Sequence, residues 1–262
     1  MPLDRQPAGD TAHRPALHRV AHRGYSAVAP ENTLPALTAG VLAGATFIEF
    51  DVRTTADGVP VVIHDRTVDR TTDGSGKVWE LTSEEIAALD AGAWFSASYA
   101  GVGVPRLTDV LDALAPAEAE LLLEIKPPAT LDEVKNILGL VADAGLIERT
   151  VVQSFDPEVV RLVPPDVRRG LLRDKFDTSQ LEVARELGVS YVNPSMNAVL
   201  GSPSTVAALN DAGVRVMPWT ANDMTLWPDL ISAGVAGLIT DRTGELTGWA
   251  QNVSAGASAS SA

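Results

Sequence analysis

The chain has 262 residues, 45% of them hydrophobic, and a formal net charge of −14. It is long enough for one large core, and single-domain α/β barrels often have this length. The acidic balance argues against nucleic acid or an anionic membrane surface as the main partner, because both need a basic patch. The lack of cysteine excludes disulfide and thiolate chemistry.

The N-terminal residues lack the apolar stretch of a secretory signal, and no apolar run approaches about 18 residues, the length of a membrane span. We therefore expect a cytoplasmic protein without a stable membrane anchor, whose oligomeric state the sequence leaves open. Residues 1–16 are polar and contain proline, which predicts a flexible arm.

The first predicted strand lies in LHRVAHRG, at 17–24, and ends at a glycine. The PENT segment at 30–33 then offers an N-cap, and apolar residues at helical spacing continue to Gly44. This order predicts one strand-helix unit.

The segment FIEFDVR alternates like a β-strand, which places Glu49 and Asp51 on one face. The dipeptide Asp57-Gly58 favours a two-residue hairpin turn, and counting outward from it sets His64 opposite Asp51. Directly opposed residues project to the same face, with Cβ atoms about 5 Å apart. The pattern therefore predicts a cluster of Glu49, Asp51 and His64.

An insertion is predicted at about 54–105, after this second strand. It contains the hairpin return VVIHD, a short helix with a Thr82/Glu85 capping box and the aromatic segment AWFSASY.

Six further strand-helix units follow, with capping boxes predicted at Thr130/Glu133 and Ser179/Glu182 and helix starts after Asp156-Pro157 and near Ser204 and Asn222. If VVIHD returns antiparallel, eight strand-helix units remain. They predict an α/β fold with one (β/α)8 TIM barrel over 17–250 and a small insertion after the second strand.

The end of the chain is predicted to be less regular. Pro228 implies a helix that either kinks or starts late. A last weak helix should reach Trp249, and the low-complexity residues 251–262 should form a flexible tail.

In a barrel of this kind the chemistry lies at the C-terminal ends of the strands. The polar and aromatic residues predicted there are His22, Arg23, Glu49, Asp51, His64, Glu124, Lys126, Gln153, Ser154, Asn193, Trp219 and Asp241.

Three of these residues are carboxylates: Glu49, Asp51 and Glu124. Like charges about 4 Å apart repel by roughly 1 to 4 kcal/mol at effective dielectric constants between 80 and 20, so the cluster needs neutralisation. One explanation is a network of salt bridges with basic side chains: Arg23, Arg53 or Lys126. The other is a hard divalent ion, and ligation by oxygen alone favours Mg²⁺ or Ca²⁺ over zinc.

Two histidines, His22 and His64, converge on this cluster, which favours acid-base chemistry over a structural role. Arg23 and Lys126 either balance the carboxylate charge or bind a phosphate oxyanion. Trp219 is either a core residue or a wall of the binding pocket.

Seven motifs follow one another along the chain: HRG at 22–24, PENT at 30–33, ExD at 49–51, HD at 64–65, ExK at 124–126, WT at 219–220 and GLITD near 240. Together they resemble the glycerophosphodiester phosphodiesterases, over about residues 18–248. The resemblance implies a barrel with a small insertion and metal-dependent hydrolysis of small-molecule glycerophosphodiesters to sn-glycerol 3-phosphate and an alcohol. The chain departs from the family at Gln153, where a hydroxyl residue is frequent, and in the segment MPWTAN.

The resemblance also implies roles for single residues: metal ligands Glu49, Asp51 and Glu124, catalytic histidines His22 and His64, and phosphate contacts Arg23 and Lys126. We add Trp219 as a substrate-binding candidate. One histidine would take a proton and the other would supply one to the leaving alkoxide. Whether water or the glycerol 2-hydroxyl attacks stays open.

Two alternatives remain. A lysophospholipase D or cyclising phosphodiesterase would use the same cluster with an apolar entrance, for which Trp94, Phe95 and Tyr99 are the candidates. A non-catalytic barrel that only binds glycerophosphate is disfavoured, because every acid, base and ligand position holds a competent residue.

Overall fold

A computed structural model describes residues 17–259 of the chain. The predicted arm at 1–16 and the last three residues of the predicted tail lie outside this range. None of the helices within 17–259 is long and apolar enough to cross a membrane.

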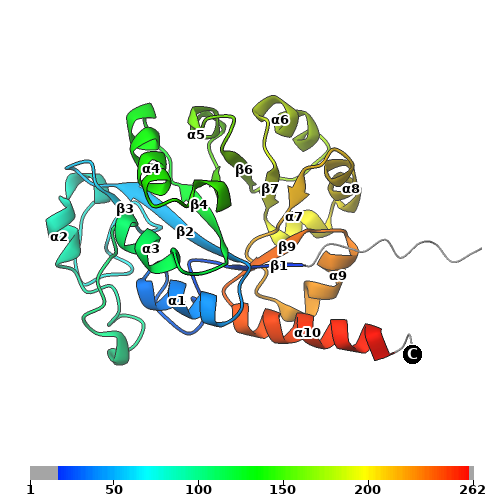
Figure 1. The fold of residues 1–262 in the computed structure, drawn as a ribbon, viewed down its shortest axis with the longest axis horizontal. Helices are drawn as coiled ribbons and strands as arrows, with labels where there is room; N and C mark the ends of the chain where they lie inside the picture. The colour runs from blue at the N-terminus through cyan, green and yellow to red at the C-terminus, as the bar shows by residue number, and fades with distance from the viewer. Residues whose placement is uncertain (1–16, 260–262) are drawn as a thin grey trace, which may run out of the picture.

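Eight parallel strands form a nearly closed barrel, as predicted (Figure 1). Around the barrel the strand order is β8, β7, β6, β5, β4, β2, β1, β9. The segment after β8 closes the ring, because Ile239 N donates to Pro218 O at 3.0 Å and Ala221 N donates to Ile239 O at 2.8 Å. The strands are β1 (His18–Ala21), β2 (Phe47–Thr54), β4 (Glu120–Ile125), β5 (Thr150–Ser154), β6 (Arg168–Arg173), β7 (Tyr191–Pro194), β8 (Arg215–Val216) and β9 (Gly237–Thr240).

Helices follow the strands and surround the barrel (Figure 1). They are α1 (Leu34–Leu42), α2 (Ser83–Ala87), α3 (Leu107–Leu114), α4 (Leu131–Asp143), α5 (Pro157–Leu162), α6 (Gln180–Leu187), α7 (Met196–Leu200), α8 (Pro203–Asp211), α9 (Trp227–Ser232) and α10 (Thr243–Ala259).

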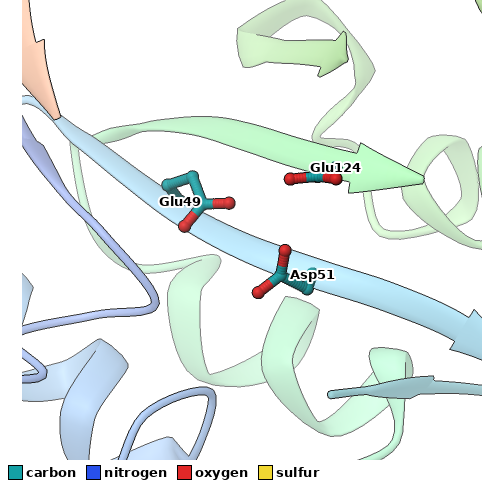
Figure 2. A group of neighbouring side chains, drawn as sticks. All are labelled: Glu49, Asp51 and Glu124. Carbon is teal, nitrogen blue, oxygen red and sulfur yellow. The ribbon is translucent and has the colours of Figure 1, made fainter. Parts of the chain in front are cut away.

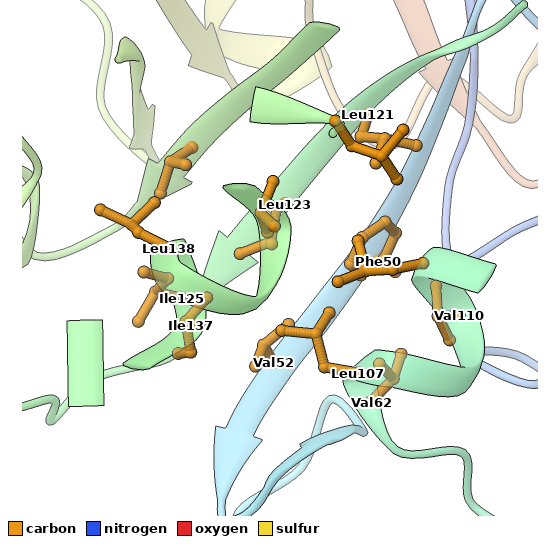
Figure 3. Packing of buried hydrophobic residues seen from close by; sticks show 14 of the residues in the cluster. Phe50, Val52, Val62, Leu107, Val110, Leu121, Leu123, Ile125, Ile137 and Leu138 are labelled. Atoms are coloured by element: carbon orange, nitrogen blue, oxygen red, sulfur yellow. The ribbon is translucent and has the colours of Figure 1, made fainter. Parts of the chain in front are cut away.

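Strand alternation separates the apolar layer from the charged interior. On β2 and β4, Phe50 and Leu123 point outward and pack against the buried faces of α3 and α4 (Figure 3). Phe47 and Leu122 point into the barrel, where they belong to a separate apolar layer. The next inward positions toward the strands' C-terminal ends hold carboxylates, because inward residues recur every two positions.

The hairpin after β2 returns antiparallel outside the eight parallel strands, as predicted, but its turn differs from the prediction. β3 (Pro60–Val62) pairs Val62 with Val52, so the loop has three residues and not two. Gly58 takes a φ of 79°, which fits a three-residue loop whose last residue is left-handed. The register therefore shifts by one residue.

This shift changes how His64 is placed. Ile63 N donates to Asp51 O at 2.9 Å, so Ile63 and not His64 lies opposite Asp51. β3 ends at Val62, and the chain leaves the ladder before His64. The direction of the His64 side chain is thus set by its own contacts and not by the strand.

The insertion after the second strand has its own small core. It contains β3, α2 and two short 3-10 helices at Val78–Glu80 and Ala97–Tyr99. Its buried apolar residues are Val61, Ile63, Val68, Val78, Ile86, Ala91 and Val104.

The predicted capping boxes at Thr82/Glu85 and Thr130/Glu133 are confirmed. The one at Ser179 is wrong, because its hydroxyl donates to Asp177 and does not cap α6.

The bounds of the last two helices, α9 and α10, can be compared with the predictions. α9 starts late, at Trp227, with Pro228 in its first turn. α10 continues to Ala259, so the predicted helix end near Trp249 is wrong. No proline interrupts this alanine-containing stretch, so nothing in it blocks helix propagation.

Candidate active site

Three carboxylates from β2 and β4 meet inside the barrel, on the C-terminal side of the apolar layer that contains Phe47 and Leu122. Figure 2 shows Glu49 and Asp51 on β2 directed toward Glu124 on β4. One carboxylate oxygen from each residue lies within 4.8 Å of the other two. The strand register explains the meeting, because Asp51 pairs directly with Glu124. The side chains are buried, with residue exposures of 2%, 1% and 4%.

Two cations contact this acidic cluster. Lys126 Nζ lies 2.9 Å from Asp51 Oδ1 and 2.7 Å from Glu124 Oε1. Arg23 Nε lies 3.4 Å from Asp51 Oδ2, and the Arg23 backbone N–H donates to Glu49 Oε2 at 2.8 Å. Two members of the predicted salt-bridge network are therefore present, whereas the side chain of Arg53 donates to the carbonyl of His64.

Burial and mutual repulsion oppose full ionisation of the three carboxylates. Burial raises the pKa of Glu49, and the neighbouring Asp51 and Glu124 raise it further. Burial and Asp51 likewise raise the pKa of Glu124 to about 8, despite its contact with Lys126. Burial also acts to raise the pKa of Asp51, but Lys126 and Arg23 outweigh it and hold that pKa below its usual range. Three ionised carboxylates against two cations would leave excess negative charge.

The loop after β1 places Arg23 against the cluster. Arg23 has a φ of 56°, and the following Gly24 has a φ of 82°. A Cβ on Gly24 would lie 2.3 Å from the backbone carbon of Ala36 in α1. Only glycine fits at the last position of the HRG motif. The tight turn at Gly24 against α1 places the Arg23 amide toward Glu49.

Asn32 is a site residue that the sequence reasoning missed. Its Nδ2 donates to Asp51 Oδ2 at 2.7 Å, and its Oδ1 accepts from the Asp51 backbone N–H at 3.2 Å. The PENT segment is both a predicted helix start and one of the seven family motifs, but neither gives Asn32 a role. Thr33 is the N-cap of α1, without a side-chain capping bond. No local pattern in the sequence identifies Asn32, because its contact with Asp51 depends on tertiary packing.

His22 is oriented by a carboxylate. Its Nδ1 lies 2.6 Å from Asp241 Oδ1, just after β9. Asp241 also accepts from Ser26 Oγ at 3.0 Å and from Asn222 Nδ2 at 2.6 Å. Burial acts to raise the pKa of Asp241, but the hydrogen bonds and the charge of His22 lower it to about 2. An ionised Asp241 favours the tautomer with the proton on Nδ1, which leaves the lone pair on Nε2.

His64 has a parallel arrangement within the insertion. Its Nδ1 lies 2.7 Å from Asp65 Oδ1, which accepts the proton of that nitrogen. Burial lowers the pKa of His64, with Arg23 and Lys126 adding to the effect and Asp51 opposing it. Both histidines therefore have a carboxylate on Nδ1.

A cavity of about 280 Å³ joins these groups. Trp219 and Phe155 pack edge to face with ring centroids 5.3 Å apart and form an aromatic wall. Trp219 Nε1 donates to the Asn193 carbonyl at 2.8 Å, so its ring is held in place. The cavity is lined by His22, Arg23, Glu49, His64, Glu124, Lys126, Gln153, Phe155, Leu172, Trp219, Thr220 and Ile239.

A cavity lined with charged groups at the carboxyl ends of barrel strands is the arrangement typical of TIM-barrel enzymes. Comparison with known proteins identifies the family. The profile of the glycerophosphoryl diester phosphodiesterase family matches residues 22–245. The chain belongs to this family and is a phosphodiesterase of the hydrolase class.

Individual relatives agree with this assignment. A glycerophosphodiester phosphodiesterase of Caldanaerobacter subterraneus is 34% identical, over 85% of this chain and 93% of the relative. A crystal structure of a glycerophosphodiester phosphodiesterase from Agrobacterium tumefaciens is 32% identical with a TM-score of 0.78, over 88% of this chain and 99% of that one. A phosphodiesterase from Oleispira antarctica, solved with the product sn-glycerol 3-phosphate, is 26% identical with a TM-score of 0.83, over 91% and 97% of the two chains.

Proposed function

We propose that this enzyme hydrolyses small glycerophosphodiesters to sn-glycerol 3-phosphate and an alcohol, with a divalent metal ion and two histidines. The observation that carries the proposal is the convergence of three kinds of group on one cavity. Carboxylates, cations and carboxylate-bound histidines all lie there.

The carboxylates fit a divalent cation. Glu49, Asp51 and Glu124 offer one oxygen each within 4.8 Å, and when all three are ionised their three negative charges exceed the two positive charges of Arg23 and Lys126. Donors that are all oxygen suit Mg²⁺ or Ca²⁺. When bound, such an ion supplies Lewis-acid stabilisation of charge on the phosphate.

Arg23 and Lys126 supply fixed positive charge at the cavity wall. Ion pairs with acidic side chains hold both, so they need little reorganisation when a phosphate enters. They would bind the phosphate oxygens and stabilise the charge that develops during phosphoryl transfer. Trp219 would pack against the glycerol or alcohol portion.

The histidines would move the protons. One Nε2 accepts the proton of the attacking hydroxyl as the new P–O bond forms. The other Nε2 donates a proton to the leaving alkoxide as the old P–O bond breaks. Carboxylates on Nδ1 keep both rings in the tautomer that this exchange needs.

A lysophospholipase D is the second candidate, favoured by the exposed aromatic segment of the insertion. Trp94 is 44% exposed, and Tyr99 donates its hydroxyl proton to the Val28 carbonyl on the loop after β1. These rings lie outside the cavity lining. The cavity therefore fits a glycerophosphodiester with a small substituent better than a lysolipid.

One assay separates these functions. We would measure release of sn-glycerol 3-phosphate from glycerophosphocholine, and of choline from a lysophosphatidylcholine, each with and without EDTA. The proposal expects metal-dependent turnover of glycerophosphocholine and little of the lysolipid. Preference for the lysolipid supports the second candidate, and no turnover of either contradicts both.

A further inference from the structure

One basic side chain of the insertion contacts two carboxylates next to the site. Arg70 Nε donates to Asp65 Oδ2 at 2.7 Å and Arg70 Nη2 to Asp65 Oδ1 at 3.0 Å. Its Nη1 donates to Glu31 Oε2 at 2.9 Å and its Nη2 to Glu31 Oε1 at 2.7 Å. The guanidinium therefore makes a forked contact with each carboxylate, a geometry that lysine cannot reproduce.

Each of these carboxylates contacts a residue of the cavity wall. Asp65 Oδ1 binds His64 Nδ1 at 2.7 Å. Glu31 Oε1 accepts from Arg23 Nη1 at 2.8 Å. A continuous series of polar contacts thus runs from His64 to Arg23, with Arg70 in the middle.

The insertion holds the loop that carries Arg70. Val68 is fully buried in the insertion core. The loop is closed by a bridge between Thr67 and Lys77 and by a hydrogen bond from Thr72 Oγ1 to the Val68 carbonyl at 2.7 Å. The position of Arg70 is therefore determined by packing outside the cavity.

We propose that Arg70 is a positioning residue of the hydrolytic site, which orients His64 through Asp65 and Arg23 through Glu31. It does not line the cavity, and both sides of its guanidinium already bind carboxylates, so it acts without touching substrate. This role rests on the proposed function, in which His64 transfers a proton. It also assigns a role to the insertion. The insertion supplies Arg70, which joins the segment that carries His64 and Asp65 to the loop that carries Glu31.

The contrast with His22 shows what Arg70 contributes. Asp241, the partner of His22, is held by the neutral donors Ser26 and Asn222. Asp65 depends on the forked contact with a cation from its own loop. Loss of Arg70 would remove both forked contacts. Asp65 would keep His64 but lose its cation, and Glu31 would keep only its ion pair with Arg23, so the His64 ring would lose its fixed orientation.

The test compares Arg70→Gln and Arg70→Lys with a matched control, Arg161→Gln. Arg161 also bridges two carboxylates, Glu158 and Glu186, and its side chain is 43% exposed against 46% for Arg70. It lies in α5 and does not line the cavity. Both glutamine variants therefore remove similar ion pairs. Arg70→Gln removes them next to the site, and Arg161→Gln removes them away from it.

We expect Arg70→Gln to lower kcat about 10-fold or more, as removal of an outer partner of a site commonly does. Arg70→Lys should restore part of the loss, and Arg161→Gln should stay within about twofold of the wild type. Because Arg70 acts through Asp65, the effects of Arg70→Gln and Asp65→Asn on kcat should be less than additive. Tm values of the two glutamine variants should be similar.

A second readout does not depend on activity. Long-range ¹H–¹⁵N NMR spectra of the full chain report the tautomer of each histidine. We expect one His64 tautomer in the wild type and in Arg161→Gln, and a mixture in Arg70→Gln. An unchanged His64 tautomer together with unchanged kcat in Arg70→Gln would overturn the proposal. If the wild type fails to hydrolyse glycerophosphodiesters, the proposed function fails while the spectra still decide the role of Arg70.

Discussion

His22 Nδ1 lies 2.6 Å from Asp241 Oδ1, although the two residues are 219 positions apart in the sequence. The barrel makes this contact, because β1 and β9 are neighbours and pair over their whole length. Asp241→Asn would replace the proton acceptor of Nδ1 by an amide that can donate to that nitrogen and favour the other tautomer. We expect kcat to fall at least about 10-fold with a smaller change in KM. Steady-state kinetics with glycerophosphocholine measure this effect. An unchanged kcat in Asp241→Asn would show that Asp241 does not contribute to catalysis.

The same carboxylate should affect stability in acid. Burial acts to raise the pKa of Asp241, but its hydrogen bonds lower it to about 2, below the ordinary value of 3.8. A lowered pKa stabilises the fold above the ordinary value, and this stabilisation is lost as pH falls toward the folded-state value. The difference in unfolding free energy between wild type and Asp241→Asn should therefore shrink between pH 5 and pH 2. Urea unfolding across this range tests it, and a constant difference would show that the lowered pKa is wrong.

The histidine pair should carry the proton transfers. General acid-base groups contribute about 10²- to 10⁴-fold, so His22→Ala and His64→Ala should each lower kcat by that order. The double variant should lose less than the product of the two single losses, because the groups act in one reaction. Circular dichroism and Tm serve as the control for folding. Near-normal kcat in either single variant would exclude that histidine from the reaction.

Substitution of Gly58 should change stability through its backbone conformation and not through steric contacts. Its φ is 79°, and a Cβ there would meet nothing within 4 Å, so Gly58→Ala should cost about 1 kcal/mol through the left-handed backbone. Gly139 in α4 is the matched control, because it also has open space but no positive φ, and Gly139→Ala should stabilise by up to about 1 kcal/mol. Chemical unfolding of the two variants should give changes of opposite sign. Stabilisation by Gly58→Ala would contradict the three-residue hairpin loop.

Regular patterns allowed much of the fold to be predicted. Alternation in β2 placed Glu49 and Asp51 on one face, and the repeated strand-helix units gave the eight-stranded barrel. The hairpin register was missed because Asp-Gly suits a three-residue loop with a left-handed glycine as well as a two-residue turn.

Contacts between loops could not be predicted from local patterns. Asn32 reaches Asp51, and Arg70 reaches Glu31, because tertiary packing brings their loops together. Periodicity describes strands and helices, but it does not specify where a side chain on an irregular loop will point. Asn32 and Arg70 were therefore missed, whereas Asp241, just after β9, was among the residues predicted at the strand ends.

Metal binding should be visible without catalysis. An ion that binds only the folded state raises Tm, by an amount set by its concentration relative to Kd. Mg²⁺ or Ca²⁺ should therefore raise the Tm of the metal-free wild type, and Glu49→Gln should reduce that rise. Glu245→Gln is the control, since Glu245 lies outside the cluster, near Tyr25 and Arg242. An equal rise in all three proteins would place the ion elsewhere.

The central claim is that Glu49, Asp51 and Glu124 hold a divalent ion on which hydrolysis depends. The most direct measurement follows sn-glycerol 3-phosphate release from glycerophosphocholine as Mg²⁺ or Ca²⁺ is titrated into chelator-treated wild type and Glu49→Gln. We predict no turnover in chelator, recovery of the wild type on adding the ion, and a need for more ion in Glu49→Gln. Full turnover by the wild type in excess chelator would contradict the claim.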